Sequence, residues 1–518
     1  MKTVIIDRSP FDPAWNDGAA RKRFFGYDLA DGASFATLMD ALKKVRYEPS
    51  ALAAILEKYN DDIGAGDRAR ENIRALAGGG FAVVTGQQPC LLGGPLYTVY
   101  KIATAIRLAR ALSASLSVPV VPVFWNASND SDVSEVDHAF VSRPDGTLKR
   151  YAADLGRPRL LSSIPSSVVR AAVDEFLHDR NENDNAPVLA ELLRTSENGF
   201  ARDVSSFYVR LFAPFGLVAV EPMHLNTLAP AFFGTALNRH DAVRSALSER
   251  VSALAAHGLP VPIRDIPSTT VFGVENDIRS RISIDGDAII AGNVRHPLSQ
   301  ARAFVDARIQ NMTCDVFSRI MFQQYAIPSL AYIAGPSEFN YLAEAASLSE
   351  VFGIPMPVIY PRASVTLLED KFARIQASFG MSDDALFGGY EAFKPHADSA
   401  LTSIVERFSS ASAAFVSEMN ARVASRDAAF ERTTEQFGRR LREDVDRLAE
   451  KAERSLTRAE GVDTANLSRL RGSVLPREGY QERTLGIAEF IHRHGIGIIG
   501  DIVEGITIGG ASHQLLRL

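Results

Sequence analysis

The chain has 518 residues, and its 56 basic and 62 acidic side chains give a formal net charge of −6. This length indicates about three structural units. Hydrophobic residues make up 46% and charged residues 23%, a composition that excludes disorder as the dominant state. A pI near 6.0 provides no general attraction to phosphate backbones, so we expect no nucleic-acid partner.

Cysteine content and hydropathy narrow the class of protein further. Cys90 and Cys314 are too few for a disulfide framework or a four-thiolate zinc site, and packing is a better expectation for both than catalysis. No apolar stretch reaches the roughly 18 residues of a membrane span, because even the apolar C-terminal piece is broken by Glu489 and Asp501. Asp7 interrupts the start where a signal peptide needs an apolar run. We therefore expect a cytoplasmic protein without a membrane partner.

Hydrophobic periodicity predicts an N-terminal helical segment followed by an α/β core. Residues 1–75 carry apolar residues at three- and four-residue spacing, as amphipathic helices do. In the core, 76–370, apolar runs at 81–84 and 118–125 flank a glycine-rich turn and an amphipathic helix over 96–112, which predicts a βαβ unit. Further strand-like runs lie at 216–222, 328–335 and 356–364. This alternation predicts a Rossmann-type parallel sheet covered by helices.

Other segments interrupt or follow this core. Insertions are expected at about 145–215 and 223–315, and a turn at Gly286 within ISIDGDAII predicts a small β-hairpin. Residues 371–475 are predicted to form an α-helical coiled-coil domain, because apolar residues recur every three or four positions between charged flanks. Packing of these helices on the core is the alternative to a projecting hairpin. Residues 476–518 are expected to return to the core as a tail.

The first motif is TGQQPCLLGGPLYTVYK, which runs from Thr85 to Lys101 at the carboxyl end of the first predicted core strand. Open α/β sheets bind ligands at this edge. Gly93 and Gly94 would allow backbone to approach a ligand, and the helix starting near Pro95 would offer N–H groups to an anion. The motif is neither a Walker loop nor GxGxxG. A phosphate or carboxylate site and a merely structural turn are equally compatible with it.

Two more motifs follow predicted strands. WNASNDSDVSEVDH follows the second strand, and its Asp130 and Asp132 are candidates to hold Mg²⁺, which prefers carboxylates, water and phosphates. An acidic loop that caps a helix is the alternative. The third motif, AGPSEFNY, spans Ala334–Tyr341 and again joins a strand end to a helix start. Three polar strand ends at one sheet edge favour a binding site there.

These motifs, with SRIMFQQYAIPSLAYIAGPSEFNYLAE, MPVIYPRAS and REGYQER in the same order, resemble the bacillithiol-biosynthesis cysteine-adding enzymes, the BshC family. The resemblance covers nearly the whole chain. It implies a Rossmann-type core similar to nucleotidyltransferases and class I aminoacyl-tRNA synthetases, with inserted connecting segments, and a coiled coil used for homodimerisation. It also implies a ligase that forms a carbon–nitrogen amide bond between cysteine and glucosaminyl-malate. ATP would be the co-substrate and Mg²⁺ a cofactor.

The chemistry of amide formation suggests roles for residues that match the family's motifs. Gln87 and Gln88 would orient the activated carboxylate, Lys101 and Arg319 would neutralise developing charge, and a metal would bind at the two aspartates named above. Those implied to be catalytic are Gln87, Gln88, Lys101, Asp130, Asp132 and Arg319. Those implied to bind nucleotide or substrate are Thr85, Gly86, Gly94, Pro95, Tyr97, Trp125, Gly335, Pro336, Glu338, Tyr341 and Arg362. Gln323, Pro361, Gln481, Glu482 and Arg483 also match family motifs.

The chain departs from the family pattern in its second motif, which reads Trp-Ile-Ala-Ser-Glu-Asp-His-Asp in the family. Asn129 stands at the Glu position and Ser131 at the His position, so a carboxylate and an imidazole are missing. Two other functions therefore stay open. One is a diverged ligase that uses another amino acid or amino-sugar acceptor, and the other is a non-catalytic nucleotide-binding dimeric scaffold.

A final expectation concerns assembly. Residues 399–460 are predicted to form a helical hairpin that pairs with a second copy of the chain. Its seam consists of Phe437, Leu441, Val445, Leu448 and Ala452. If the hairpin projects into solvent, the preceding helix alone cannot cover this seam, and a symmetric interface is the common way to bury it.

Overall fold

The computed structural model describes residues 2–28, 31–143, 145–180, 182–388, 399–423, 430–459 and 464–518. The chain forms two compact units. The core unit comprises Met1–Ser142, Leu148–Asp370 and Gly479–Leu518, and the helical unit comprises Arg143–Thr147 and Lys371–Glu478. Within the predicted coiled-coil domain, 389–398, 424–429 and 460–463 lie outside the described residues. No described helix has both the length and the apolar character needed to cross a membrane.

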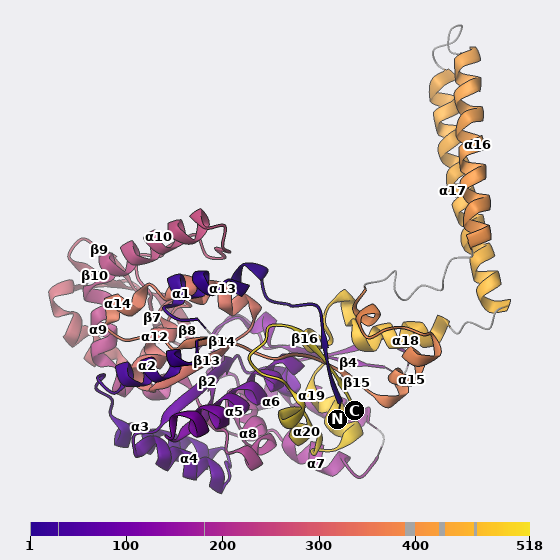
Figure 1. Ribbon diagram of the computed structural model, residues 1–518. Coiled ribbons are helices and arrows are strands. Elements are labelled where there is room, and N and C mark those ends of the chain that lie inside the picture. The colour runs from indigo at the N-terminus through magenta and orange to yellow at the C-terminus, as the bar shows by residue number, and fades with distance from the viewer. Residues whose placement is uncertain are drawn as a thin grey trace. The chain divides into compact units, whose positions relative to one another are not determined.

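A five-stranded parallel sheet in the order β14-β13-β2-β3-β6 forms the centre of the core unit (Figure 1). The strands are β2 (Phe81–Gln87), β3 (Val120–Asn126), β6 (Val218–Val220), β13 (Ser329–Ala334) and β14 (Val358–Pro361). Every residue of these five strands is buried except Gln87 at the end of β2. Helices cover the sheet, and its strands are continuous apolar runs. The predicted Rossmann-type α/β core is confirmed.

The strand order places a topological switch point in the middle of the sheet. The chain runs outward from β2 to β3 and β6, and then crosses to the other side of β2 to form β13 and β14. Ligands of open α/β sheets bind where the carboxyl ends of such strands diverge. Helix α5 (Leu96–Leu116) follows β2 and packs on β2, β3 and β13, while α13 (Pro336–Ala345) follows β13. Both helices therefore begin next to the switch point.

Helices surround this sheet and build most of the remaining core unit. Before the sheet come α1 (Gly18–Phe25), α2 (Ala33–Leu42), α3 (Pro49–Asp62) and α4 (Asp67–Ala77). Between β3 and β13 lie α6 (Ser166–His178), α7 (Ala186–Leu192), α8 (Phe200–Leu211), α9 (Pro230–Asn238), α10 (His240–Ala256), α11 (Ala301–Arg308) and α12 (Arg319–Ala326). After β13 follow α14 (Leu348–Phe352), α19 (Ile487–His494) and α20 (Ile498–Gly505).

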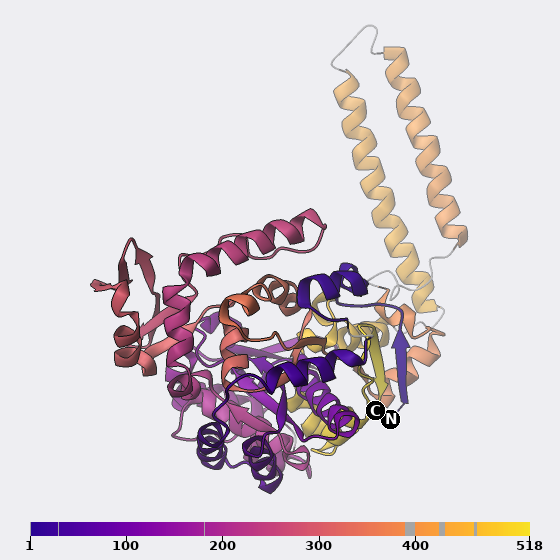
Figure 2. The same cartoon turned by 60° about the vertical axis from the view of Figure 1, so that its left-hand side comes forward.

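A second sheet joins the two ends of the chain. Strand β1 (Lys2–Ile6) pairs antiparallel with β16 (His513–Arg517), which pairs parallel with β15 (Ser364–Leu368). Figure 2 shows both termini side by side at this sheet. The N-terminal segment is therefore not entirely helical, and the tail returns to the core unit as a strand and two helices.

His513 in this sheet makes stability depend on pH. It is fully buried, and its ring nitrogens lie 2.7 Å from Ser364 Oγ and 2.9 Å from Thr366 Oγ1. Burial lowers its pKa to about 4. Because the pKa of an unfolded histidine is about 6.5, the unfolded state takes up the proton first as pH falls. Stability should therefore be lost between about pH 6.5 and 4, by about 1.4 kcal/mol per pH unit from this residue. Denaturant unfolding of wild type and His513→Gln at several pH values checks this, and parallel curves would contradict it.

Small antiparallel sheets occur in the insertions. At the start of the first, β5 (Leu148–Ala152) pairs with the preceding strand β4 (His138–Ser142). In the second, β7 (Val271–Glu275), β8 (Ile278–Arg281) and β12 (Met312–Cys314) form a sheet in the order β12-β7-β8. The other sheet contains β9 (Ser283–Asp285), β10 (Ala288–Ala291) and β11 (Val294–Pro297), and Gly286 with φ +57° turns the chain between β9 and β10. The predicted hairpin is present.

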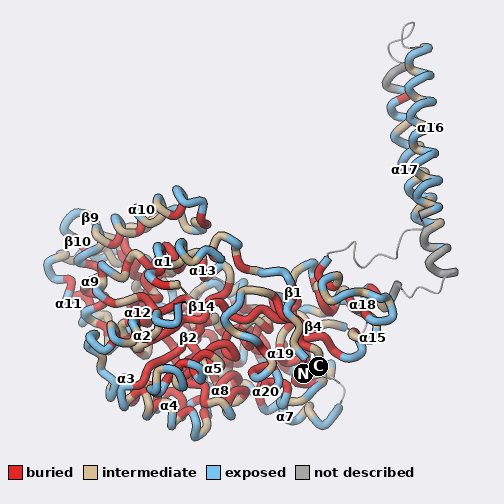
Figure 3. The backbone as a smooth tube through the Cα atoms, in the orientation of Figure 1, coloured by how far each residue is buried: buried red, intermediate tan, exposed pale blue. Residues whose placement is uncertain are grey.

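The helical unit contains two long antiparallel helices, α16 (Ser399–Val423) and α17 (Phe430–Ala459), which run side by side (Figures 1 and 2). Thr434 Oγ1 donates a hydrogen bond to Asn420 Oδ1 at 2.5 Å, and Gly438 leaves room for Val416. Figure 3 shows that most of the two helices is exposed, in contrast to the strands of the core unit. The unit also includes α18 (Thr464–Val474) and most of α15 (Asp370–Ser378).

Candidate functional site

A cleft of about 850 Å³ lies in the core unit at the carboxyl ends of β2, β3 and β13. It brings together most of the residues expected from the three motifs. These lining residues are Gly86, Gln87, Gln88, Pro95, Tyr97, Lys101, Trp125, Asp130, Arg319, Gly335, Pro336, Glu338, Tyr341 and Arg362. Thr85, Gly94 and Asp132 do not line the cleft. Thr85 is buried below it in β2, where its hydroxyl donates to Ile333 O at 3.2 Å.

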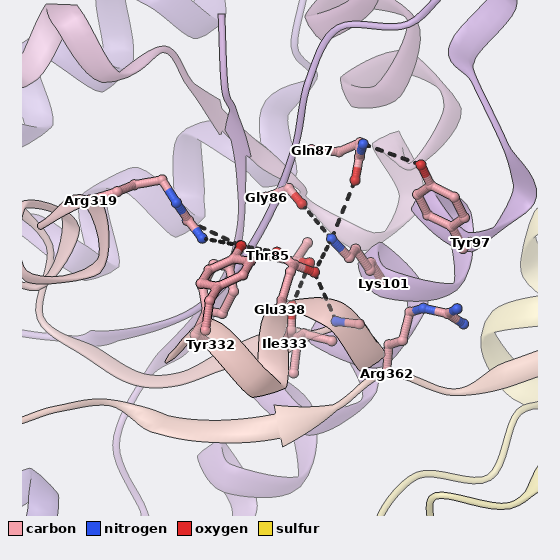
Figure 4. Close-up of polar contacts among 12 residues, drawn as sticks. Thr85, Gly86, Gln87, Tyr97, Lys101, Arg319, Tyr332, Ile333, Glu338 and Arg362 are labelled. Atoms are coloured by element: carbon pink, nitrogen blue, oxygen red, sulfur yellow. Dashed lines mark hydrogen bonds and ion pairs between the residues drawn. The ribbon is translucent and has the colours of Figure 1, made fainter. Parts of the chain in front are cut away.

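Lys101 is a buried lining residue of the cleft, and we call its contacts with Gly86, Gln87 and Glu338 (Figure 4) the floor. Its side chain is 4% exposed, and Nζ donates to Gly86 O at 2.8 Å and to Gln87 Oε1 at 3.3 Å. Nζ also forms an ion pair with Glu338 Oε2. An ammonium has three N–H donors, so protein partners use all of them. Lys101 thus fastens the end of β2 to the first turn of α13.

Glu338 connects this floor to a tyrosine and an arginine. Its Oε2 accepts from Gly335 N at 2.8 Å, which caps α13, and its Oε1 accepts from Tyr332 OH at 2.8 Å. Arg319 donates to Tyr332 OH at 3.2 Å and to Tyr341 OH at 3.0 Å. Burial acts to raise the pKa of Glu338, but Lys101 and Arg319 outweigh it, so this pKa is lowered and the carboxylate stays ionised. Burial also lowers the pKa of Lys101, although Glu338 opposes the shift.

Gly86 permits the close packing at the switch point. A Cβ at this position would lie 2.9 Å from Tyr332 OH and 3.4 Å from Trp125 O. Any larger residue would therefore displace β2 or the tyrosine. Trp125 itself is buried, and its Nε1 has no hydrogen-bond partner among the described residues. Since Trp125 lines the cleft, this N–H is a donor that a bound substrate could use.

The start of α5 differs from the expected anion site. Leu96 N already donates to Leu485 O at 2.8 Å, and Thr98 N donates to Pro95 O at 3.0 Å. Gly94 has φ +68°, and a Cβ there would lie 2.6 Å from the Cβ of Cys90. The glycine turn therefore accommodates other parts of the protein, and backbone partners occupy two of the amides that an anion site would use. These contacts favour the structural turn, the alternative that the sequence left open.

The two aspartates of the second motif are separated by their hydrogen bonds. Asp130 Oδ2 accepts from Gln88 Nε2 at 2.8 Å, and Asp130 Oδ1 lies 3.5 Å from Arg279 Nη1. Asp132 instead accepts from Ser134 N at 3.1 Å and caps the short helix η3 (Val133–Glu135). Among the described residues no three His, Cys, Asp or Glu side chains are grouped as a metal site requires. These residues do not fit a resident magnesium ion.

The C-terminal tail contributes a buried ion pair beside the cleft. Arg362 and Glu482 have side chains 2% and 0% exposed, and Arg362 Nη2 donates to Glu482 Oε1 at 2.7 Å. Glu482 also accepts from Ser364 Oγ at 2.8 Å and from Val365 N at 2.8 Å. Burial acts to raise the pKa of Glu482, but Arg362 outweighs it and the pKa is lowered. Arg362 therefore anchors the tail through Glu482. Arg483, which follows Glu482 in the tail, lines the cleft.

Several residues that line the cleft were not predicted for the site. They are Phe272, Arg279, Arg281, Cys314, Asp315, Tyr332 and His138, among others. Arg279 and Arg281 come from β8, a strand that the sequence pattern did not predict. Asp315 accepts from the amides of Phe317 and Ser318, both at 3.0 Å, and burial raises its pKa to about 6. His138 stands in the acidic motif, which the sequence indicated only as a possible metal site.

Neither cysteine is set up as a nucleophile. Both are buried free thiols. Burial raises the pKa of Cys90 to about 12 and also raises the pKa of Cys314. Both therefore remain protonated near neutral pH, in agreement with the expectation that they pack.

Fold and cleft together define a Rossmann-like protein whose ligand cleft lies at the switch point of its sheet. Residues 13–363 match the family description "Bacillithiol biosynthesis BshC, N-terminal Rossmann-like domain". Residues 365–518 match "Bacillithiol biosynthesis BshC, C-terminal coiled-coil domain". The chain belongs to the bacillithiol biosynthesis BshC family, as its motifs suggested.

Curated relatives match along nearly the whole chain. A "Putative cysteine ligase BshC" from Koribacter versatilis is 29% identical and covers 96% of this chain and 97% of its own. The relative of the same name from Geobacillus thermodenitrificans is 28% identical and covers 95% of both chains. That from Carboxydothermus hydrogenoformans is 26% identical and covers 96% of this chain and 95% of its own.

Proposed function

We propose that the protein is an ATP-dependent ligase that joins the carboxylate of cysteine to the amine of glucosaminyl-malate. The family membership over both domains and the names of the relatives support this proposal. The observation that carries it to this chain is the cleft at the switch point, where the Lys101–Glu338 pair fixes the floor. Rossmann-type folds bind nucleotides at this place.

The cleft provides groups that amide formation requires. A free carboxylate does not form an amide in water without activation, so ATP would convert it into an adenylate or an acyl phosphate. Arg319 gives two of its five N–H donors to Tyr332 and Tyr341, so it retains donors for a phosphoryl oxygen. Gln87 is held by Lys101 and close to Tyr97, which would keep its amide oriented toward the activated group. Mg²⁺ would arrive with the nucleotide.

Two arginines of the second insertion favour an anionic acceptor. Arg279 and Arg281 lie on the same side of β8, and their guanidinium carbons are 4.3 and 4.4 Å from the ring centre of Phe272. Each arginine faces one carboxylate, with Asp130 at 3.5 Å from Arg279 and Asp315 at 3.3 Å from Arg281. Thr313, Cys314 O and Thr269 O accept further N–H groups of the two arginines, but each guanidinium has five donors and keeps some for a ligand. Two stacked guanidinium groups of this kind suit the carboxylates of a malate group.

Arg281→Ala should raise the KM for glucosaminyl-malate and leave the KM for ATP unchanged. Loss of a charge-assisted hydrogen bond of about 1.5–3 kcal/mol corresponds to a rise of roughly 10- to 150-fold. Steady-state kinetics with each substrate varied in turn measures both constants. Arg295→Ala is the matched control, because Arg295 is an exposed arginine of β11 outside the cleft. A rise in the KM for ATP alone would assign the arginines to the nucleotide instead.

The proposed reaction has a direct test. The pure protein, incubated with ATP, Mg²⁺, cysteine and glucosaminyl-malate, should produce the thiol amide, which mass spectrometry detects. Absence of product over a range of pH and metal conditions would contradict the assigned substrates. A thermal-shift series with nucleotides, amino acids and amino sugars separates the two alternatives. Stabilisation by a different amino acid favours a diverged ligase, consistent with Asn129 and Ser131, and stabilisation by ATP alone favours a scaffold.

We also propose that the helical unit forms a homodimer, with a correction to the expected interface. Leu441, Val445 and Ala452 are half-buried as α16 packs along α17, so the single chain already covers this part of the seam. Other apolar side chains remain exposed. They are Ile404, Phe408, Phe415 and Met419 on α16, and Phe437 and Leu448 on α17. A second hairpin could bury them.

A further inference from the structure

His138 and Asp137 form a hydrogen-bonded pair at the cleft. His138 Nδ1 lies 2.6 Å from Asp137 Oδ1, and Arg150 Nη2 lies 3.3 Å from the same oxygen. The side chain of His138 is 28% exposed and lines the cleft. Phe140 packs against the imidazole with 5.2 Å between ring centres, which restrains the ring. The pair is therefore part of the cleft wall, at the start of β4.

This contact fixes which nitrogen of His138 carries the proton. An ionised carboxylate only accepts hydrogen bonds, so Nδ1 must hold its hydrogen and donate it to Asp137. The neutral imidazole then keeps its lone pair on Nε2. Within the described part of the chain, Nε2 makes no hydrogen bond. A histidine held in this way by a carboxylate can accept a proton and be stabilised as imidazolium.

The other acids of the cleft are engaged with partners. Asp130 and Glu135 both accept from Gln88 Nε2 at 2.8 Å. Asp315 accepts from two backbone amides and faces Arg281, while Glu338 is bound by Lys101, Tyr332 and a backbone amide.

Amide formation requires a base, because an amine attacks only through its lone pair and must lose a proton once the bond forms. We propose that His138 is the general base that deprotonates the acceptor amine, a role that rests on the proposed ligase function. The amine nitrogen bonds to the activated carboxyl carbon of cysteine, and the bond from that carbon to the phosphate oxygen breaks. The phosphate group leaves with the electron pair, and the amine proton passes to Nε2. ATP supplies the activation, and Asp137 stabilises the imidazolium.

Two nucleophiles can separate this role from carboxylate activation. Hydroxylamine is largely unprotonated at neutral pH, so it captures an activated cysteine as the hydroxamate without help from a base. His138→Gln should therefore form cysteine hydroxamate at nearly the wild-type rate. Its rate of amide formation with glucosaminyl-malate should fall about 100-fold or more, while both KM values change little. Asp137→Asn retains an oxygen that accepts from Nδ1 but lacks the charge. Its rate of amide formation should therefore fall less, by about tenfold, while hydroxamate formation is retained.

His240→Gln is the matched control, because His240 also lies beside an aspartate, 3.4 Å from Asp241, but outside the cleft. It should leave both rates unchanged. Amide formation by His138→Gln within threefold of wild type would overturn the inference, and so would an equal loss of both products. If His138→Gln fails to fold by circular dichroism, the ratio of the two products in Asp137→Asn decides. Wild-type enzyme that forms neither product would overturn the proposed function, and the role of His138 with it.

Discussion

Lys101→Met should abolish nearly all ligase activity and lower the free energy of unfolding by about 3 kcal/mol. The substitution removes all three donors that hold Gly86, Gln87 and Glu338 together. Glu338 would then be a largely buried carboxylate without its ion-pair partner, and Arg319 is linked to it through the hydroxyl of Tyr332. Since Lys101 positions both sides of the switch point, the geometry of the floor should fail even where the protein still folds.

Two further variants separate charge from position. Lys101→Met combined with Glu338→Gln removes the unpaired charge, so it should recover part of the lost stability but none of the activity. Lys58→Met is the control, because Lys58 forms an exposed ion pair with Asp62 and should change stability by less than about 1 kcal/mol. Denaturant unfolding and the mass-spectrometric assay measure the two properties. Wild-type stability in Lys101→Met would show that the pair does not hold the cleft floor.

The central sheet could be predicted because its strands are buried on both faces. Runs such as 81–84 and 118–125 are continuously apolar, and this pattern can be recognised without knowing which strands lie beside them. Strand β1 was missed because its partner is about five hundred residues away, and no local sequence pattern indicates this pairing. The antiparallel strand β8 was missed because a half-exposed strand with alternating arginines resembles a loop.

The site shows the same division between local and distant information. Residues at strand ends, such as Gln87 and Glu338, were predictable because parallel strands bring their carboxyl ends to one edge. Arg279 and Arg281 reach that edge from an insertion, which sequence spacing cannot place. Lys101 was expected to neutralise developing charge. The structure shows that Gly86, Gln87 and Glu338 already use its three donors, so it positions the cleft instead. Motifs identify which residues meet, whereas hydrogen bonds determine what each can still contact.

Phe408→Glu combined with Phe415→Glu should convert the proposed dimer into monomers at micromolar concentration. The two phenylalanines are 45% and 55% exposed in the single chain and lie on one stripe of α16 with Ile404 and Met419. The antiparallel register places Leu448 within one turn of the level of Phe408, and Phe437 within one turn of the level of Phe415, because Asn420 faces Thr434. Charges placed in the middle of such an interface cannot be solvated without separating the chains. Light scattering coupled to size-exclusion chromatography measures the molar mass.

Ser403→Glu combined with Ser410→Glu is the matched control, because it adds the same charge to exposed positions of α16 away from the stripe. This control should remain dimeric. Ligase activity should persist in the monomeric variant, since every residue that lines the cleft belongs to the core unit. If the wild-type protein is already monomeric at micromolar concentration, the exposed stripe does not pair with a second copy and the proposed dimer is wrong. If monomers form but lose activity, the expectation that the core unit alone supplies the active cleft is wrong.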